Sequence, residues 1–277
     1  MKQVGFKPGN SYFFVATVKE ELGALGMRAF MNSTQEKVDI AIALDGNLGE
    51  VEYGALGIHG RKVIFRGPGA HTMRSKGVPN PNLAVARAVQ DILCLAVPET
   101  PEEKWTVINI GQIGGGTVTN ALSQESFFAL DIRSGDQAVL DGLIKEVVKI
   151  SERIATEMKL QIHHEVFEDS KACQIPGAKE SVLVRTAVDV LSYLGFKDIY
   201  LTPFGSTDAA ASLEKGIPSI SLGRASCRKG HTLDEEGDIS SFYTGLKQIL
   251  LVLLSLEGPD GLRAVDELVA YSYGGGN

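Results

Sequence analysis

The chain has 277 residues, of which 44% are hydrophobic and 22% are charged, and its formal net charge is -7 at pH 7. These values are those of an ordinary globular protein with enough length for one large or two modest domains, and they exclude general disorder. The acidic balance argues against nucleic acid or an anionic membrane as the main partner, because both bind basic surfaces.

Neither secretion nor membrane insertion is indicated by the sequence. The three cysteines, Cys94, Cys173 and Cys227, are far apart and form no CxxC pair, so they predict neither a disulfide framework nor a thiolate zinc site. The first ten residues lack the apolar core of a signal peptide. The longest apolar run, ILLVLLSL, is shorter than the about 20 residues that span a membrane. We therefore expect a cytoplasmic protein.

The first two predicted strands both end in acidic residues. The run SYFFVATV at 11–18 predicts a strand that ends at the adjacent Glu20 and Glu21. After a short predicted helix, the nearly all-apolar run at 38–46 predicts a second strand, covered on both faces, that stops at Asp45. Open α/β sheets bind ligands at the carboxyl ends of their strands, so these acids are predicted to lie at a site.

The pattern of the sequence changes near residue 57. Strands are predicted for GRKVIFR, TVINIGQIGG, ESFFALDIRS and LQIHHEVFED, and amphipathic helices for NPNLAVARAVQDILCLAV and QAVLDGLIKEVVKISERIATEMK. Their order is β-α-β-β-α-β, which is that of a ferredoxin-like split unit. We therefore expect a compact domain inserted between about residues 58 and 170.

The α/β pattern resumes after this insertion and ends with the predicted helix ISSFYTGLKQILLVLLSLEG. The tail from Gly258 onward predicts one short helix and a flexible glycine end. The expected organisation is an α/β domain built from residues 1–57 and 173–277, with the α+β domain at 58–172 inserted into it.

The two adjacent glutamates have the chemistry that metal-dependent amide hydrolysis requires. That reaction needs hard oxygen and imidazole ligands, and one further carboxylate that is free to accept a proton. Neighbouring side chains at a strand end point in different directions, so they can divide these tasks. We assign Glu20 as the general base and Glu21 as a metal ligand. The alternative for this pair is a solvated helix start with acidic residues in its first turn.

Asp45 and His231 are candidate metal ligands with ordinary structural alternatives. Asp45 precedes a glycine, and a strand-end Asp-Gly is also a common turn. His231 lies in RKGHTLDEE, where a surface or capping role is the alternative. Three other histidines show no ligand spacing and are predicted to be structural: His59, His163 and His164.

The glycine-rich run GQIGGGTVTN invites comparison with phosphate-binding loops. It matches neither GxGxxG nor GxxxxGK[ST], so nucleotide binding is not predicted. A tight turn that leads to Asn120 is the plainer interpretation.

Eight short motifs occur in the order in which a known enzyme family carries them: VATVKEELGALG, LDG, GPGAHT, GGGTVTNAL, ALDIRS, FGSTDAA, GIPSISLG and GHTLDEE. Over about residues 11–256 the chain therefore resembles the M20 family of zinc-dependent peptidases and deacylases, which includes tripeptide aminopeptidase-like enzymes. The resemblance implies a zinc-peptidase-like α/β catalytic domain with an inserted ferredoxin-like α+β lid that often mediates dimers.

The resemblance also implies roles for the acidic residues and for His231. Glu20 resembles the general base, Glu21 and His231 resemble ligands of one zinc ion, and Asp45 resembles a ligand of the second zinc ion. Cobalt or manganese is an alternative metal, since oxygen and imidazole ligands accept all three.

Five further residues resemble substrate-contacting positions of the family. His71 resembles the histidine that stabilises the developing oxyanion, in some members from the partner subunit. Asn120 and Arg133 resemble residues that hold a substrate carboxylate, for which an arginine fork is well suited. Gly205 and Ser206 resemble the substrate-facing loop of the catalytic domain. Strand-end packing and surface ion pairs are the alternative roles.

One part of the family pattern has no counterpart in the sequence. M20 members carry an N-terminal His-x-Asp ligand motif and a later aspartate that bridges the two metals, and no His-x-Asp occurs in these 277 residues. We therefore expect an N-terminally incomplete catalytic domain that binds zinc weakly and is inactive, or nearly so, as an isolated chain.

The expected function is hydrolysis of the amide bond of a small peptide or N-acyl amino acid, carried out by a homodimer that forms through the lid. Aminopeptidases, carboxypeptidases and deacylases share these motifs. The alternative is a non-catalytic dimerisation or binding module, or a gene fragment, in which the acidic residues no longer serve catalysis.

Overall fold

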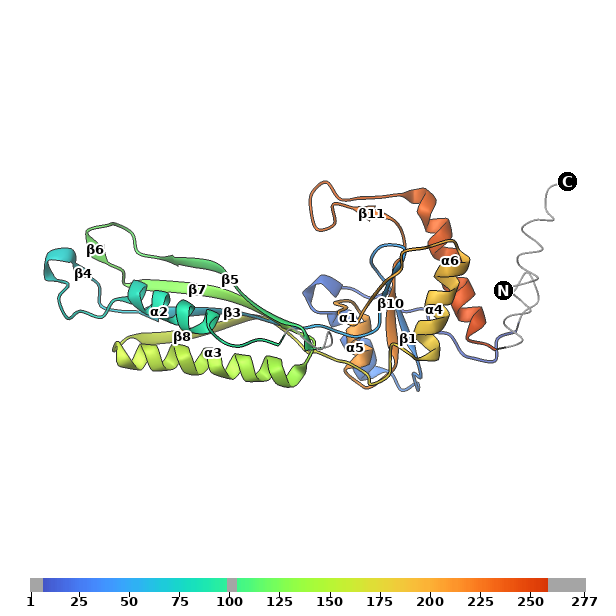
Figure 1. The fold of residues 1–277 in the computed structure, drawn as a ribbon, viewed down its shortest axis with the longest axis horizontal. Helices are drawn as coiled ribbons and strands as arrows, with labels where there is room; N and C mark the ends of the chain where they lie inside the picture. Colours follow the sequence, from blue (N-terminus) through green and yellow to red (C-terminus); the bar gives the residue numbers. More distant parts are fainter. Residues whose placement is uncertain (1–6, 99–103, 259–277) are drawn as a thin grey trace. The chain divides into compact units, whose positions relative to one another are not determined.

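The computed structural model describes residues 7–98 and 104–258, which form two compact units (Figure 1). Unit 1 contains the chain up to Ala55 and from Ile175 onward, and unit 2 contains Leu56–Gln174. The short helix expected in the C-terminal tail lies outside the described residues.

Unit 2 contains a four-stranded antiparallel sheet in the order β5-β7-β3-β8. The strands are β3 (Gly57–Arg66), β5 (Thr106–Gly115), β7 (Glu125–Ser134) and β8 (Gln161–Ser170). Helix α2 (Pro81–Leu93) follows the first of these strands in the chain, and α3 (Gln137–Glu157) follows the third. This is the ferredoxin-like arrangement that the order of elements predicted.

Both helices of unit 2 begin with a side-chain cap. The carboxamide oxygen of Asn80 accepts hydrogen bonds from two backbone N–H groups of α2, and Pro81 occupies the first turn. The carboxylate of Asp136 accepts two such bonds from α3. These residues are the ones that favour helix starts, so the boundaries follow from the local sequence.

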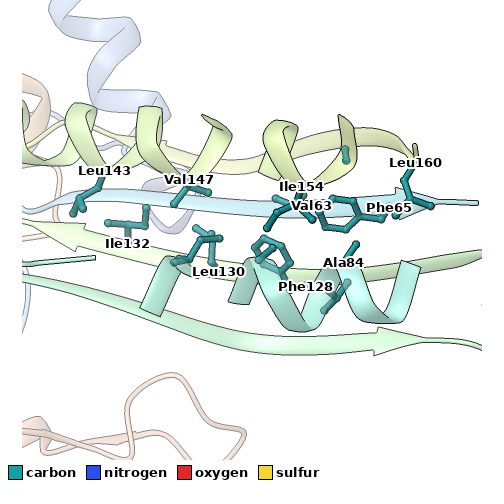
Figure 2. Close-up of a cluster of buried hydrophobic side chains, with 14 of the residues drawn as sticks. Val63, Phe65, Ala84, Phe128, Leu130, Ile132, Leu143, Val147, Ile154 and Leu160 are labelled. Atoms are coloured by element: carbon teal, nitrogen blue, oxygen red, sulfur yellow. The ribbon is translucent and has the colours of Figure 1, made fainter. Parts of the chain in front are cut away.

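The core of unit 2 lies between the sheet and its two helices (Figure 2). Alternate residues of β7 face the helices, because successive side chains of a strand point to opposite faces. The buried side chains include Val63, Phe65, Ala84, Phe128, Leu130, Ile132, Leu143, Val147 and Ile154.

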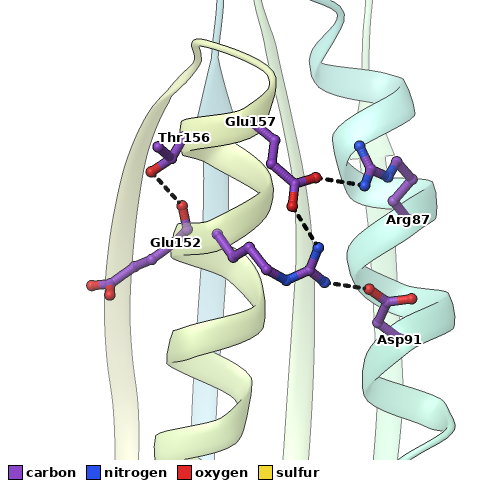
Figure 3. A network of polar contacts seen from close by, with 6 residues as sticks. Arg87, Asp91, Glu152, Thr156 and Glu157 are labelled. Atoms are coloured by element: carbon purple, nitrogen blue, oxygen red, sulfur yellow. Dashed lines mark hydrogen bonds and ion pairs between the residues drawn. The ribbon is translucent and has the colours of Figure 1, made fainter.

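A network of ion pairs joins the outer surfaces of α2 and α3 (Figure 3). Arg153 donates hydrogen bonds to Glu157, at 2.9 Å, and to Asp91, at 2.6 Å. Arg87 donates to the other carboxylate oxygen of Glu157 at 2.7 Å. All four side chains are exposed to solvent, so the network contributes little to the free energy of unfolding.

Unit 1 contains a mixed four-stranded sheet in the order β1-β10-β2-β9. Strand β10 pairs in parallel with β1 and antiparallel with β2, and β2 pairs in parallel with β9. The strands are β1 (Ala41–Leu44), β2 (Glu50–Glu52), β9 (Tyr200–Thr202) and β10 (Ser219–Leu222).

Helices lie on both faces of the unit 1 sheet (Figure 1). The helices α4 (Val182–Tyr193) and α6 (Phe242–Ser255) pack together on one face, over the buried core of this unit. On the other face, α5 (Ala209–Leu213) contacts β1 and β10, and α1 (Leu25–Ser33) contacts α5.

Within the described residues, no helix combines the length and the apolar character that crossing a membrane requires.

Two predictions about the first strands are wrong. Residues 11–18 belong to no sheet, because no described strand pairs with their backbone. Strand β1 forms, but none of its side chains is fully buried and Leu44 is 44% exposed, so it is not the fully covered strand that was predicted.

Candidate functional site

Glu20 and Glu21 begin a short 3-10 helix, η2 (Glu20–Leu22), at a sharp reversal of the chain. Lys19 has a φ of 59°, in the left-handed region, and turns the backbone at the end of the extended segment. The N–H of Gly26 then donates to the carbonyl of Val18 at 3.0 Å, which closes the reversal. The two carboxylates therefore lie on a tight turn.

His231 lies in a loop between two short strands, β11 (Cys227–Arg228) and β12 (Glu236–Gly237). Its φ is 61°, and its N–H donates to a carboxylate oxygen of Glu235 at 3.1 Å. The Nδ1 atom of His231 lies 3.7 Å from Oε2 of Glu21, and both side chains are largely exposed. The structure thus brings together the two residues that were predicted to share one zinc ion.

Asp45 directly follows β1, at the carboxyl end of that strand. One of its carboxylate oxygens accepts a hydrogen bond from the N–H of Gly46 at 2.8 Å and also from the guanidinium of Arg224. The backbone N–H of Arg224 donates to the carbonyl of Gly46 at 3.2 Å. Asp45 is therefore held both as a turn former and as the partner of a cation.

Glu20 lies in an acidic environment that changes its protonation. Its pKa is raised to about 7, first by burial and then by the negative charges of Asp45, Glu21 and Asp208, while His231 acts to lower it. These effects place all four groups within electrostatic reach of Glu20. The four unit 1 residues predicted as the general base and metal ligands therefore belong to one cluster.

Sequence reasoning missed Glu52, the last residue of β2. The pKa of its carboxyl is raised to about 7, mainly by burial and in addition by the charges of Glu50, Asp45 and Glu20. Its Oε2 atom is buried and forms no hydrogen bond within the described residues. A Cβ added to Gly205 would lie 2.8 Å from this oxygen. The signal in the sequence was EVEY, in which two acids alternate with apolar residues on a short strand.

The predicted substrate-facing loop connects β9 to α5. Gly205 is buried and its N–H donates to the carbonyl of Gly54 at 3.1 Å, whereas Ser206 is exposed. Asp208 follows at the start of α5, where one carboxylate oxygen accepts a hydrogen bond from the hydroxyl of Thr17. The other carboxylate oxygen of Asp208 is buried and unpaired within the described part of the chain. No role was predicted for Asp208, although it lies within the FGSTDAA motif.

His71 and Asn120 lie together in unit 2. His71 ends β4 (Ala70–His71), which pairs with β6 (Ala121–Leu122), and the N–H of Thr72 donates to the carbonyl of Asn120 at 2.9 Å. The Nδ1 atom of His71 accepts a hydrogen bond from the backbone N–H of Met73 at 3.2 Å. In the neutral ring this leaves the proton on Nε2, which can donate.

Arg133 lies at the opposite end of the unit 2 sheet from Asn120. The eight residue-to-residue steps from Glu125 to Arg133 along β7 correspond to about 26 Å of extended chain. Its Nε and Nη2 atoms donate to Asp131 at 3.1 and 3.0 Å, and this hydrogen bonding raises the pKa of the guanidinium. Within unit 2, the structure does not bring Arg133 together with His71 and Asn120.

The carboxylate and imidazole groups of the unit 1 cluster meet only some of the requirements of a divalent metal site. Two atoms that bind one zinc ion at about 2.1 Å each lie at most about 4.2 Å apart. The separation of 3.7 Å between Glu21 and His231 meets this limit. In the ranges 7–98 and 104–258, however, no group of three or more histidine, cysteine, aspartate or glutamate side chains is placed to hold a metal ion. Of the predicted ligands, Glu21 and His231 thus lie close enough to share one ion.

Comparison with known proteins agrees with the fold of unit 2. Residues 53–159 match the family model of the peptidase dimerisation domain of M20 enzymes. The middle of the chain is therefore similar to an M20 peptidase dimerisation domain.

Solved structures extend the similarity beyond this M20 domain. A tripeptidase from Staphylococcus aureus subsp. aureus Mu50 matches with a TM-score of 0.73 and 25% identity, over 86% of this chain and 62% of that chain. Aminopeptidase PepT from Bacillus cereus ATCC 10987 matches with a TM-score of 0.69 and 22% identity, over the same shares. These matches confirm the predicted fold, an α/β unit with an inserted M20 dimerisation domain, and the resemblance to M20 peptidases.

The protein YqjE from Bacillus subtilis (strain 168) is 24% identical over 248 residues, which are 87% of this chain and 63% of YqjE. The chain therefore spans less than two thirds of the length of each of these three relatives.

Proposed function

We propose that the chain takes part in metal-dependent hydrolysis of the amide bond of a small peptide or N-acyl amino acid. The observation that carries this proposal is the cluster around Glu20, a carboxyl with a pKa of about 7 beside the pair formed by Glu21 and His231. The tripeptidase and aminopeptidase among the similar structures support this class of substrate.

Glu21 and His231 would hold one metal ion, and Asp45 would contribute to a second. Zinc, cobalt or manganese at this position supplies a positive charge that polarises the substrate carbonyl and makes water more acidic. The pair Glu21–His231 fits such an ion because one carboxylate oxygen and one imidazole nitrogen face each other there.

Glu20 is the proton carrier in this proposal. An acid whose pKa lies near the working pH is suited both to accept a proton and to release it. Glu20 takes the proton of the attacking water and passes it to the leaving amine. Its partial burial and the surrounding carboxylates support this role, because they raise its pKa from the 4.5 of an ordinary glutamate.

The substrate-binding residues of unit 2 suggest a homodimer. His71 and Asn120 lie at one end of the sheet and Arg133 at the other, too far apart for one copy to apply all three to one small substrate. We assign Arg133 to the carboxylate of the substrate, and His71 and Asn120 to the substrate in the site of the partner copy. There the Nε2–H of His71 would donate to the developing oxyanion. The dimerisation domain supports this arrangement.

Glu20→Gln tests the assignment, because glutamine keeps the shape of the side chain and cannot accept the proton. In a protein with a completed site, we expect unchanged zinc content and at least about a 100-fold loss of turnover on tripeptides and N-acyl amino acids. Retained turnover would refute the role of Glu20. The 277-residue chain alone is expected to hydrolyse these substrates at least tenfold more slowly than the S. aureus tripeptidase.

Two ion pairs favour the alternative, a non-catalytic dimerisation or binding module. The carboxylate of Asp45 is engaged by Arg224, and the fork of Arg133 is engaged by Asp131, so both groups already have partners of opposite charge. This alternative predicts that removal of Arg224 leaves zinc affinity unchanged.

We also propose a cytoplasmic location. It is supported by the three widely spaced cysteines of the sequence, which favour a reducing compartment.

A further inference from the structure

Two of the predicted metal ligands lie on loops that are far apart in the sequence but are held together in unit 1. Asp45 begins the loop that joins β1 to β2, and His231 lies in the loop between β11 and β12. Residues 223–227 follow β10 and lead to His231 through β11. Metal affinity depends on the residues that hold the ligands in place as well as on the ligands themselves.

The loop after β1 is paired with residues 223–227 through its backbone. Asn47 forms an isolated parallel bridge with Ala225, and the N–H of Leu48 donates to the carbonyl of Ala225 at 3.1 Å. Ala225 is fully buried, so this pairing is shielded from water.

Asn47 extends this pairing with its side chain. Its carboxamide oxygen accepts a hydrogen bond from the N–H of Cys227 at 2.7 Å. Cys227 is the first residue of β11, and His231 follows four positions later. An asparagine in a turn commonly hydrogen-bonds within that turn. Here the backbone N–H of Asn47 donates to Oε2 of Glu50 at 2.8 Å, and the side chain bonds to the other segment instead.

Helix α6 packs against the same segment. A Cβ added to Gly245 would lie 2.0 Å from the carbonyl oxygen of Arg224, so the helix approaches the backbone of the segment closely. The side chain of Gln248 is fully buried, and its Nε2 atom donates to the carbonyl of Gly223 at 3.3 Å. A Cβ added to Gly223 would in turn lie 1.6 Å from the carbonyl oxygen of Asn47. The segment therefore cannot move without displacing Asn47 or α6.

We propose that Asn47 is a positioning residue for His231. Its carboxamide oxygen anchors the start of β11 on the loop that follows Asp45, and this anchor keeps His231 beside Glu21. Loss of the oxygen frees the start of β11, so that His231 lies beside Glu21 less often. The metal role of His231 rests on the proposed function, whereas the link between the two loops does not.

Hydrogen exchange, followed residue by residue by NMR, tests the link between the loops. Asn47→Ala removes the acceptor, and we expect the amide of Cys227 to exchange at least tenfold faster. Asn47→Asp keeps an oxygen in the same place and should change this rate by less than about threefold. Asn47→Gln moves the oxygen by one methylene and is the second disruptive variant if Asn47→Ala does not fold. Unchanged exchange of Cys227 in the disruptive variants would overturn the link.

Val190→Ala separates the link from a general loss of stability. Val190 lies on α4 in the buried core of unit 1, away from both loops in the sequence. We expect its truncation to lower the free energy of unfolding and to leave the exchange of Cys227 unchanged under native conditions. Equal acceleration in Val190→Ala and Asn47→Ala would mean that Asn47 acts only through global stability, which contradicts the proposal.

A double-mutant cycle in equilibrium dialysis tests the positioning role. Asn47→Ala should weaken zinc binding at least fivefold, and Asn47→Asp should not weaken it. If Asn47 acts through His231, Asn47→Ala should change zinc affinity by less than about twofold in a His231→Ala background. Equal losses in both backgrounds would overturn the positioning role, as would faster exchange of Cys227 with unchanged zinc affinity.

The same measurements separate this inference from the proposed function. If the ring NMR signals of His231 do not change when zinc is added to the original chain, the proposed function and the metal role of Asn47 are both contradicted. Faster exchange of Cys227 in Asn47→Ala would still establish the link between the loops. Zinc binding that depends on His231 but not on Asn47 would contradict the inference and leave the proposed function standing.

Discussion

The Nδ1 atom of His231 lies 3.7 Å from Oε2 of Glu21, although the two residues come from segments far apart in the sequence. Unit 2 contains a second exposed pair with the same separation, 3.7 Å between Nε2 of His163 and Oε1 of Glu165. The first pair also acts electrostatically on Glu20, which is influenced in addition by Asp45 and Asp208. Variants of the two pairs can therefore distinguish zinc binding by a single histidine and carboxylate from zinc binding by the whole cluster.

Zinc binding should depend on the pair in unit 1. We expect His231→Ala and Glu21→Gln each to weaken zinc binding at least tenfold in equilibrium dialysis, because each removes one of the two ligands proposed for the same ion. His163→Ala is the matched control and should leave zinc affinity within twofold of the original. Equal effects of His231→Ala and His163→Ala would mean that zinc binds to exposed histidines without a built site.

Arg224 should compete with a metal ion for Asp45. Its guanidinium occupies a carboxylate oxygen of Asp45, so Arg224→Ala removes a competing cation and leaves the cluster more negative. We expect zinc affinity in the same dialysis experiment to rise about three- to tenfold. Arg228→Ala, which removes a cation from the nearby strand β11, controls for net charge alone. An unchanged or lower affinity in Arg224→Ala would favour the non-catalytic module.

Glu52 should make the metal-free protein less stable as the pH rises. Its pKa is about 7 in the folded protein and about 4.5 when unfolded, so the folded state binds the additional proton between these values. The free energy of unfolding therefore falls as the pH rises from 4.5 to about 7, and the penalty is complete above that range. Below pH 4.5 the carboxyl is protonated in both states and contributes nothing.

Glu52→Gln removes this penalty, because glutamine resembles the protonated acid. We expect urea unfolding to show a gain of about 2 kcal/mol at pH 8 and little change at pH 4.5, after allowance for partial exposure. Glu165→Gln, at an exposed acid, should change neither value. A gain that is the same at both pH values would show that the titration of Glu52 is not its cause.

Gly205 should tolerate no side chain. A Cβ at this position would lie 2.8 Å from the carbonyl oxygen of Gly54 and 2.8 Å from Oε2 of Glu52, and the backbone atom cannot move aside alone. Gly205→Ala should lower the free energy of unfolding of unit 1 by about 1–3 kcal/mol. Gly142→Ala is the control, since a Cβ there meets nothing within 4 Å and lies in α3, where alanine should stabilise by about 0.5–1 kcal/mol.

Phe127 and Phe128 should differ in their contribution to the stability of unit 2. Phe128 is fully buried against the helices, so Phe128→Ala should cost about 3–5 kcal/mol. Phe127 points to the other face, where its ring lies 4.1 Å from Nζ of Lys62, and Phe127→Ala should cost about 1–2 kcal/mol. Unfolding can be followed by the fluorescence of Trp105, the single tryptophan. If the two variants lost similar amounts of unfolding free energy, β7 would not bury one face more than the other.

The sequence predicts unit 2 more completely than unit 1. Asn80 and Asp136 cap helices whose apolar periodicity is clear, and the strands between them alternate, so local patterns agree with the final packing. In unit 1, residues 11–18 have equally clear strand composition, yet they remain outside the sheet. Strand formation depends on a neighbour that supplies hydrogen bonds, and local composition cannot show whether that neighbour is present.

The residues of the candidate site could likewise be predicted from the sequence only in part. The motifs led to Glu20, Glu21, Asp45 and His231, and the structure gathers these residues, although their assigned roles remain predictions. Glu52 and Arg224 were missed, because their relation to the cluster arises only when separate segments fold together. The ion pair of Arg133 with Asp131 was likewise not predicted, because side chains two residues apart come together only once the strand has formed.

The distance between His71 and Arg133 along the unit 2 sheet has a genetic consequence. If each site takes its oxyanion donor from the partner copy, a mixed dimer of Glu20→Gln and His71→Ala chains contains one site with both defects and one with neither. In a protein with a completed site, two inactive alleles would then restore part of the activity when expressed together.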